Sequence, residues 1–294
     1  MTVSVAQARA RRLHGGMAAL RPYLPTLFPL LFLVLFFAVP MGMMFALGFR
    51  GEHTDALSLA TYRRVLTDEL TGEGVLRTLV MSTMVAVCVT VMAYPIAYFL
   101  ARSSSKLRTL VFAVAIAPEL AGVVLRTYGW WIILDDEGLI NSVLLSLGLI
   151  DSPLPLMNNM LGVVVGLTHV TLPFGILSLM TNIQGIDPNM EKAARTLGAS
   201  RLAILRYILL PLSMSGLVSS FFVAFALAAS AYATPAILGG STFGVLATMI
   251  YEEIEFFVNW PGAAVLANLL LVIVLAVGFF GTRLETRMQS RLTA

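Results

Sequence analysis

Six long apolar stretches divide this chain, and they limit its fold more than any other feature of the sequence. Each has about 20 residues or more, the length that a helix needs to cross the hydrocarbon core of a bilayer. Lipid offers the backbone no hydrogen-bond partners, so each stretch is predicted to be a spanning helix of an all-α integral membrane protein. The stretches are Thr26 to Phe49, Leu76 to Ala101, Thr109 to Trp131, Leu161 to Thr181, Leu212 to Ala236 and Gly262 to Gly281.

The low content of charged residues agrees with a surface that faces lipid. Hydrophobic residues make up 58% of the 294 residues and charged residues only 12%, whereas about 25% of a soluble domain is charged. Membrane lipid is therefore the expected surrounding, and the modest net charge of +3 gives no reason to expect a nucleic-acid partner. The single cysteine, Cys88, excludes an intrachain disulfide and a cysteine metal site, and we expect it to be a packing residue.

The distribution of basic residues predicts the orientation of the six helices. Basic loops stay in the cytoplasm, so residues 1–25 and 282–294 are predicted to be cytoplasmic tails that flank a transmembrane domain of residues 26–281. The first stretch lacks a small-residue cleavage pattern, so we expect it to remain as a spanning helix. Fourteen of the nineteen Lys and Arg residues fall on the predicted cytoplasmic side: Arg9, Arg11, Arg12, Arg21, Arg102, Lys106, Arg108, Lys192, Arg195, Arg201, Arg206, Arg283, Arg287 and Arg291.

The third and fifth loops, on the predicted outer side, hold acids and no bases. One interpretation is a solvated surface, and the other is a docking surface for an external partner or an attractant for cations. The acids are Asp135, Asp136, Glu137, Asp151, Glu252, Glu253 and Glu255.

The fourth loop, residues 183–211, is predicted to contain two helices that meet at a glycine. Asp187 followed by Pro188 is a strong helix start, and Gly198 is typical of a helix end because glycine tolerates a left-handed backbone. Ser200 can cap a second helix from Arg201 to Leu210. The first helix carries one apolar face, which either docks on another protein or packs on the chain's own spans. The face comprises Met190, Ala193, Ala194 and Leu197.

The same loop resembles the cytoplasmic loop of ABC importer permeases. That family's pattern is Glu-Ala-Ala, three residues, Gly, nine residues, Ile, one residue, Leu-Pro. Lys192 stands at the position of the family's glutamate, and Glu191 is one residue earlier. On a helix, this shift of one residue rotates the side chain by about 100° around the helix axis. The positions that fit the pattern without a gap are Ala193, Ala194, Gly198, Ile208, Leu210 and Pro211.

A second region, Leu125 to Pro153, is similar to permeases of the spermidine/putrescine class, and the resemblance extends over about residues 25 to 285. It implies the type I importer fold, in which this chain forms half of a pore in the bacterial inner membrane. It also implies a second permease, related but different, two ATPase subunits that bind ATP and Mg²⁺, and an external solute-binding protein. The residues that it places in ATPase coupling are Glu191, Lys192, Ala193, Ala194, Arg195, Leu197 and Gly198.

The chain itself is not predicted to be an enzyme. It contains no G-x-x-x-x-G-K-[ST] motif, so it lacks the phosphate cradle of P-loop ATPases, and we expect no cofactor on this chain. No H-E-x-x-H motif or cysteine–histidine cluster occurs, which argues against a membrane-embedded enzyme and against a metal site. The alternative function is a self-sufficient secondary transporter or channel for a small cation, but such a protein does not require the helix–Gly–helix loop.

A few polar residues fall inside the predicted spans and are candidates for the substrate path. Glu119, beside Pro118, lies near the middle of the third span, where a carboxylate is costly and either holds an ammonium group or fixes helix packing. Arg126 lies two turns further on, at the predicted outer boundary, and Tyr128 is expected in an interfacial aromatic belt. His169 in the fourth span is a packing residue or a substrate contact.

Overall fold

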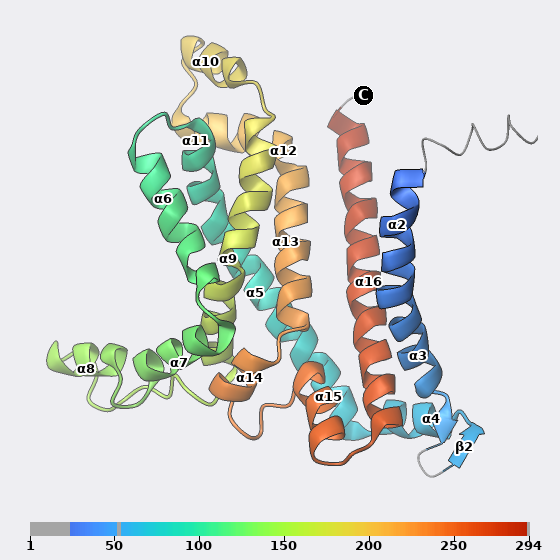
Figure 1. Cartoon of the computed structure of the whole chain (residues 1–294). Helices are drawn as coiled ribbons and strands as arrows, with labels where there is room; N and C mark the ends of the chain where they lie inside the picture. Colours follow the sequence, from blue (N-terminus) through green and yellow to red (C-terminus); the bar gives the residue numbers. More distant parts are fainter. Residues whose placement is uncertain (1–23, 52–53, 293–294) are drawn as a thin grey trace, which may run out of the picture.

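The computed structural model describes residues 24–51 and 54–292, and most of them are helical (Figure 1). The basic residues Arg9, Arg11, Arg12 and Arg21 of the predicted amino-terminal tail lie outside the described residues. Within these described ranges, four helices are long and apolar enough to cross a membrane by themselves, and two bent helix pairs raise that number to six if each pair forms one span. The prediction of an all-α membrane protein is therefore confirmed.

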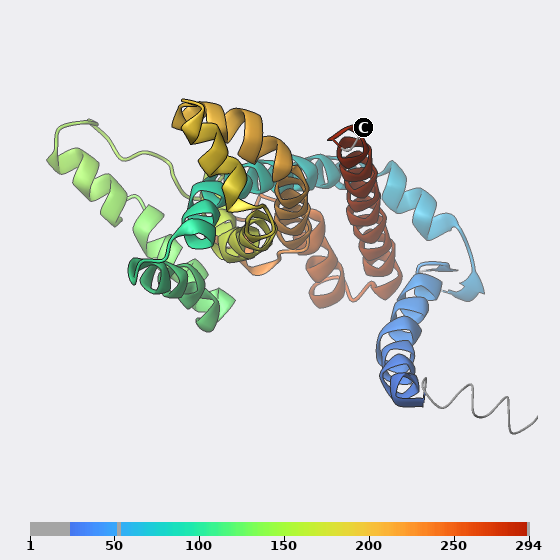
Figure 2. The same ribbon diagram turned by 90° about the horizontal axis from the view of Figure 1, so that it is seen from above.

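The first predicted span forms a continuous helical rod of α2 (Leu24–Leu33), the π-helical turn η2 (Val34–Ala38) and α3 (Val39–Leu47). None of the described residues from 28 to 47 is buried. The α3 part of the rod contacts the last helix, α16, and Figure 2 shows the rod at the edge of the molecule, away from the centre of the bundle. Most of its apolar side chains therefore face lipid or another protein.

A short hairpin follows the first rod. Strands β1 (Arg50–Gly51) and β2 (Thr54–Leu57) pair antiparallel, with Arg50 opposite Leu57 and Gly51 opposite Thr54. Helix α4 (Ala60–Thr67) then leads to the second span.

Three helices form the centre of the bundle: α5 (Glu69–Arg102), α9 (Met160–Gln184) and α13 (Met214–Ala229). Met81 and Val85 of α5 pack with Leu167 of α9 and Phe225 of α13 in one buried cluster, and Cys88 lies at its edge as a partly buried packing residue. Helix α16 (Trp260–Leu292) packs on α13 and on α15 (Leu246–Glu255). It continues past the predicted span end at Gly281, so the backbone of the predicted tail 282–294 is helical as far as Leu292.

A glycine sets the distance between the three central helices. A Cβ atom added at Gly175 would lie 2.5 Å from Val89 Cγ1 and 2.9 Å from Ser220 Oγ. We predict that Gly175→Leu destabilises the bundle by about 1–3 kcal/mol, because membrane helices need small residues where their backbones approach closely. Thermal unfolding in detergent measures this, with Gly278→Leu as the control because nothing lies within 4 Å of its Cβ position. Equal melting temperatures for the two variants would contradict the prediction.

The third predicted span, Thr109 to Trp131, is not one straight helix. It consists of α6 (Leu107–Ile116), the 3-10 turn η3 (Ala117–Leu120) and α7 (Val123–Leu134), followed by α8 (Leu139–Ser146). The two halves meet at 103°, and α7 and α8 run across one end of the bundle (Figure 1). Pro118 in the turn supplies no backbone donor, and Gly122 precedes α7 in an extended conformation, so the helix breaks between them.

The fifth predicted span, Leu212 to Ala236, is also shorter than expected. Its helix α13 ends at Ala229, and a separate short helix α14 (Ala233–Leu238) follows. Before it, the helix of Arg201–Leu212 joins α13 at a bend of 68°. The carboxyl end of α16, the start of α2 and the fourth loop all lie at the same end of the molecule (Figure 1).

Candidate functional site

Helix α10 (Pro188–Thr196) stands out from one end of the bundle (Figure 1). The Asp187 carboxylate accepts a hydrogen bond from the backbone N–H of Asn189 at 2.9 Å, and Pro188 occupies the first helical position. Both were predicted, and each satisfies or removes a donor that would otherwise lack a partner.

Gly198 ends α10 as predicted, with a φ of +85°. Its N–H donates to the carbonyl of Arg195 at 2.9 Å, and the N–H of Ala199 donates to the carbonyl of Ala194 at 3.0 Å. This pair of bonds is a Schellman motif, which requires a left-handed residue at Gly198. Ser200 Oγ then accepts from the N–H of Ala203 at 3.2 Å and starts the second helix.

The second helix of the loop consists of α11 (Arg201–Ile204), the π-helical turn η4 (Leu205–Leu209) and α12 (Leu210–Leu212). The predicted helix from Arg201 to Leu210 therefore exists, with a π-helical turn within it. Such turns add a residue locally and change the helix direction.

The apolar face of α10 is turned away from the bundle. Leu197 is 88% exposed and Met190 is 49% exposed, Ala193 is exposed and Ala194 is half-buried. Leu202 of α11 is also exposed, to 71%. Of the two interpretations of this face, packing on the chain's own spans is therefore wrong for most of it.

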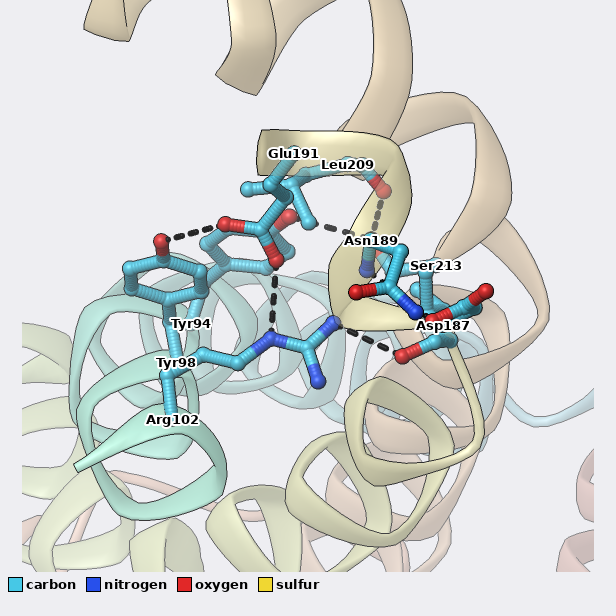
Figure 3. Close-up of polar contacts among 9 residues, drawn as sticks. Tyr94, Tyr98, Arg102, Asp187, Asn189, Glu191, Leu209 and Ser213 are labelled. Atoms are coloured by element: carbon cyan, nitrogen blue, oxygen red, sulfur yellow. Dashed lines mark hydrogen bonds and ion pairs between the residues drawn. The ribbon is translucent and has the colours of Figure 1, made fainter. Parts of the chain in front are cut away.

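Glu191 points in the opposite direction, toward the bundle (Figure 3). Its side chain is 7% exposed and accepts from Arg102 Nε and from Tyr98 Oη, each at 2.8 Å. Arg102 also donates through Nη2 to the carbonyl of Ile186 at 2.9 Å. Lys192, at the position of the family's glutamate, is exposed, as is Arg195.

Two further polar contacts join the parts of the bundle that flank the fourth loop. The hydroxyls of Tyr94 and Ser213 lie 3.1 Å apart (Figure 3), and Asn182 Nδ2 donates to Ser215 Oγ at 2.6 Å. Neither Tyr94 nor Tyr98 was predicted to have a role. Their four-residue spacing with Arg102 places all three on one face of α5, but nothing in the sequence indicates their partners about ninety residues or more away.

The predicted substrate-path residues lie at the break in the third span. Arg126 Nη1 contacts Glu119 Oε1 at 2.6 Å, with side chains that are 10% and 26% exposed. The Glu119 carboxylate is therefore compensated within the chain. Tyr128, on the same helix as Arg126, is 51% exposed.

His169 is linked to this region through Trp130, whose ring meets the imidazole edge to face with centroids 5.6 Å apart. His169 also lines a cavity of about 410 Å³ with Pro118, Leu172 and Ile176. In the part of the chain that the structure describes, His169 Nδ1 and Arg126 Nε are buried without a hydrogen-bond partner. The region of the break thus holds the Glu119 carboxylate, the Arg126 guanidinium and the His169 imidazole. The described residues contain no group of three or more potential metal ligands.

Comparison with known proteins identifies the class to which this fold and this protruding loop belong. The family described as "Binding-protein-dependent transport system inner membrane component" matches residues 18–290, nearly the whole chain. The chain therefore belongs to this family, the membrane-spanning permeases of type I ABC importers. The resemblance found in the sequence is confirmed. Members of this family are membrane subunits of transport systems and not ATPases.

Among curated relatives, the spermidine/putrescine transport system permease PotB of Escherichia coli is 32% identical over 216 residues, which cover 73% of this chain and 78% of the relative. A probable molybdenum ABC transporter permease of Haloferax volcanii is 29% identical over 252 residues, 85% of this chain and 87% of the relative.

Solved structures share the fold. A chain of a bacterial ABC transporter for alginate import superposes with a TM-score of 0.78 at 17% identity, covering 94% of this chain and 99% of that one. A chain of the methionine ABC transporter, in an inward-facing conformation, gives a TM-score of 0.58 at 20% identity, covering 74% and 96%.

Proposed function

We propose that this chain forms half of the translocation pore of an ATP-driven importer for a polyamine or a related small organic cation. Its partners are a second, related but different permease, two ATPase subunits that bind ATP and Mg²⁺, and an external binding protein that delivers the substrate. The single observation that carries the proposal is the outward apolar face of α10 on a chain whose family match covers residues 18–290.

The shape of the fourth loop supports its role as the ATPase contact. Leu197, at the end of this short helix, is 88% exposed. An exposed apolar side chain is costly in water, so it favours burial against a partner. The residues assigned to ATPase coupling all lie on this helix or at its end: Glu191, Lys192, Ala193, Ala194, Arg195, Leu197 and Gly198. This end of the molecule also holds the basic loops, so we place it and both termini in the cytoplasm, with the chain in the inner membrane.

The proposed substrate class rests on the relatives and on charge. The curated relatives named for spermidine/putrescine transport are up to 32% identical to this chain. Acids gather on the predicted outer side, among them Glu252 and Glu253 of α15, and they raise the local concentration of cations. Both features favour a cationic amine over an anionic solute.

The experiment that tests this proposal is reconstitution. The chain is co-expressed with the ATPase, second permease and binding protein encoded in the same genome, and the purified complex is placed in lipid vesicles. We expect uptake of labelled spermidine that requires both ATP and the binding protein. A stable complex that takes up no polyamine but another solute would remove the substrate assignment, and failure of any ATPase to co-purify would remove the function.

A pair of substitutions tests whether the break in the third span contacts the substrate. Glu119→Gln should lower polyamine uptake about tenfold, equivalent to ~1.4 kcal/mol, because the ammonium group loses its carboxylate. Arg126→Gln should raise the apparent affinity, because it frees the carboxylate from the 2.6 Å ion pair. Uptake kinetics of each variant, normalised to assembled complex, measure both effects. Unchanged kinetics in Glu119→Gln, or equal losses in the two variants, would assign the pair to helix packing alone.

A further inference from the structure

Glu191 is a buried acid in a loop that otherwise projects into water. It is 5% exposed as a residue, whereas Lys192 and Arg195 on the same helix are exposed. Burial of a carboxylate costs several kcal/mol unless ion pairing and hydrogen bonds compensate it. A helix whose only task is to dock on a partner has no need for this arrangement.

Among the described residues, the hydrogen bonds to the Glu191 carboxylate come from the end of α5. Arg102 and Tyr98 donate one hydrogen bond each to its two carboxylate oxygens, and Arg102 also holds the carbonyl of Ile186, just before α10 (Figure 3). Arg102 is the last residue of α5 and Glu191 lies in the first turn of α10. Each charge therefore has the sign that its helix end favours, which strengthens the pair.

Helix α5 connects this contact to the opposite end of the molecule. It spans 34 residues and packs along α9 and α13. Near its other end, Thr78 Oγ1 accepts from the N–H of Leu246 at 2.9 Å, and Arg77 donates to the carbonyl of Thr242 at 2.8 Å. A displacement of α10 that is passed to Arg102 therefore reaches the loops at the far end through one helix.

We infer that Glu191 is a positioning residue that clamps α10 to the end of α5 through Arg102 and Tyr98, and that it transmits the movement of α10 without contacting the ATPase. This inference rests on the proposed function. It separates two tasks on one short helix: Met190, Leu197 and the exposed basic residues face the partner, and Glu191 faces the bundle.

A double-mutant cycle in the complete reconstituted complex tests the clamp. Glu191→Gln, Arg102→Gln and the double variant are compared for ATPase co-purification, ATP hydrolysis and solute transported per ATP. We expect ATPase co-purification to be retained and transport per ATP to fall about tenfold or more in each single variant. The double variant should be no worse than either single variant, because both remove the same contact.

Two further variants keep the test decisive. Tyr98→Phe removes one hydrogen bond and keeps the ion pair, so it should lower transport per ATP less than Glu191→Gln does. If an Arg102 variant does not assemble, Tyr98→Phe takes its place in the comparison. Glu69→Gln removes the charge of an exposed acid in the first turn of the same helix, away from the clamp, and should leave transport per ATP unchanged.

Loss of ATPase co-purification in Glu191→Gln but not in Arg102→Gln would overturn the clamp, because it would make Glu191 a docking residue. Additive losses in the double variant would overturn it as well. A wild-type chain that never associates with an ATPase would instead remove the proposed function on which the clamp rests.

Discussion

Replacement of Leu197 by aspartate should abolish stable association with the ATPase while the permease remains folded. The side chain is 88% exposed in the isolated chain, so the substitution costs the fold little. In the complex it removes about 1.5–3 kcal/mol of apolar burial and adds an unpaired charge to an interface. We expect affinity for the ATPase to fall by at least about 100-fold, equivalent to ~2.7 kcal/mol.

The matched control for Leu197→Asp is Leu149→Asp, which changes another leucine that is exposed to 67% and lies just after α8, across the other end of the bundle. Pull-down of the ATPase by each purified variant measures the difference. We expect the Leu149 variant to bind as the wild type does. If Leu197→Asp retained full ATPase binding, the exposed face of α10 would not be the docking surface.

Replacement of Gly198 by valine should uncouple ATP hydrolysis from transport. The residue has a φ of +85°, and a left-handed conformation costs a β-branched residue about 1–2 kcal/mol or more. Nothing lies within 4 Å of its Cβ position, so the effect comes from the backbone rather than from a clash. The loop relieves the strain by changing the angle between α10 and α11, and we expect substrate-stimulated hydrolysis and uptake to fall at least about tenfold.

Gly148 provides the control for this backbone effect. It too has a positive φ, of +67°, with nothing within 4 Å of its Cβ position, but it follows α8 at the other end of the molecule. Gly148→Val should lower thermal stability by a similar amount and leave coupling intact. ATPase assembly together with normal substrate-stimulated hydrolysis in Gly198→Val would contradict the role of Gly198 as a hinge.

The fourth loop could be predicted from the sequence because its signals are local. Asp187, Ser200 and Gly198 each act through hydrogen bonds between residues at most five positions apart, so the residue type and its neighbours are sufficient. The long helices α5, α9 and α16 were predicted for a similar reason, because a spanning segment is recognised from the length and apolar content of one continuous stretch of sequence.

The direction of the chain at a break could not be predicted in the same way. A proline such as Pro118 is compatible with a break in the third span, but the turn of 103° depends on where α7 packs against α9 and α14. The contact of Arg126 with Glu119 was compatible with their spacing, whereas the contact of Arg102 with Glu191 joins residues 89 positions apart. Glu191 was assigned to coupling from the family pattern, and only the fold reveals that its side chain faces the bundle.

The claim that another polypeptide drives this permease through α10 is tested most directly in sealed lipid vesicles. Uptake of labelled spermidine is measured with the purified chain alone, and with the complete complex in the presence of the binding protein, each with and without ATP. We predict accumulation only in vesicles that contain the complete complex and ATP. Accumulation by this chain alone, without nucleotide, would contradict the account and favour a self-sufficient transporter or channel.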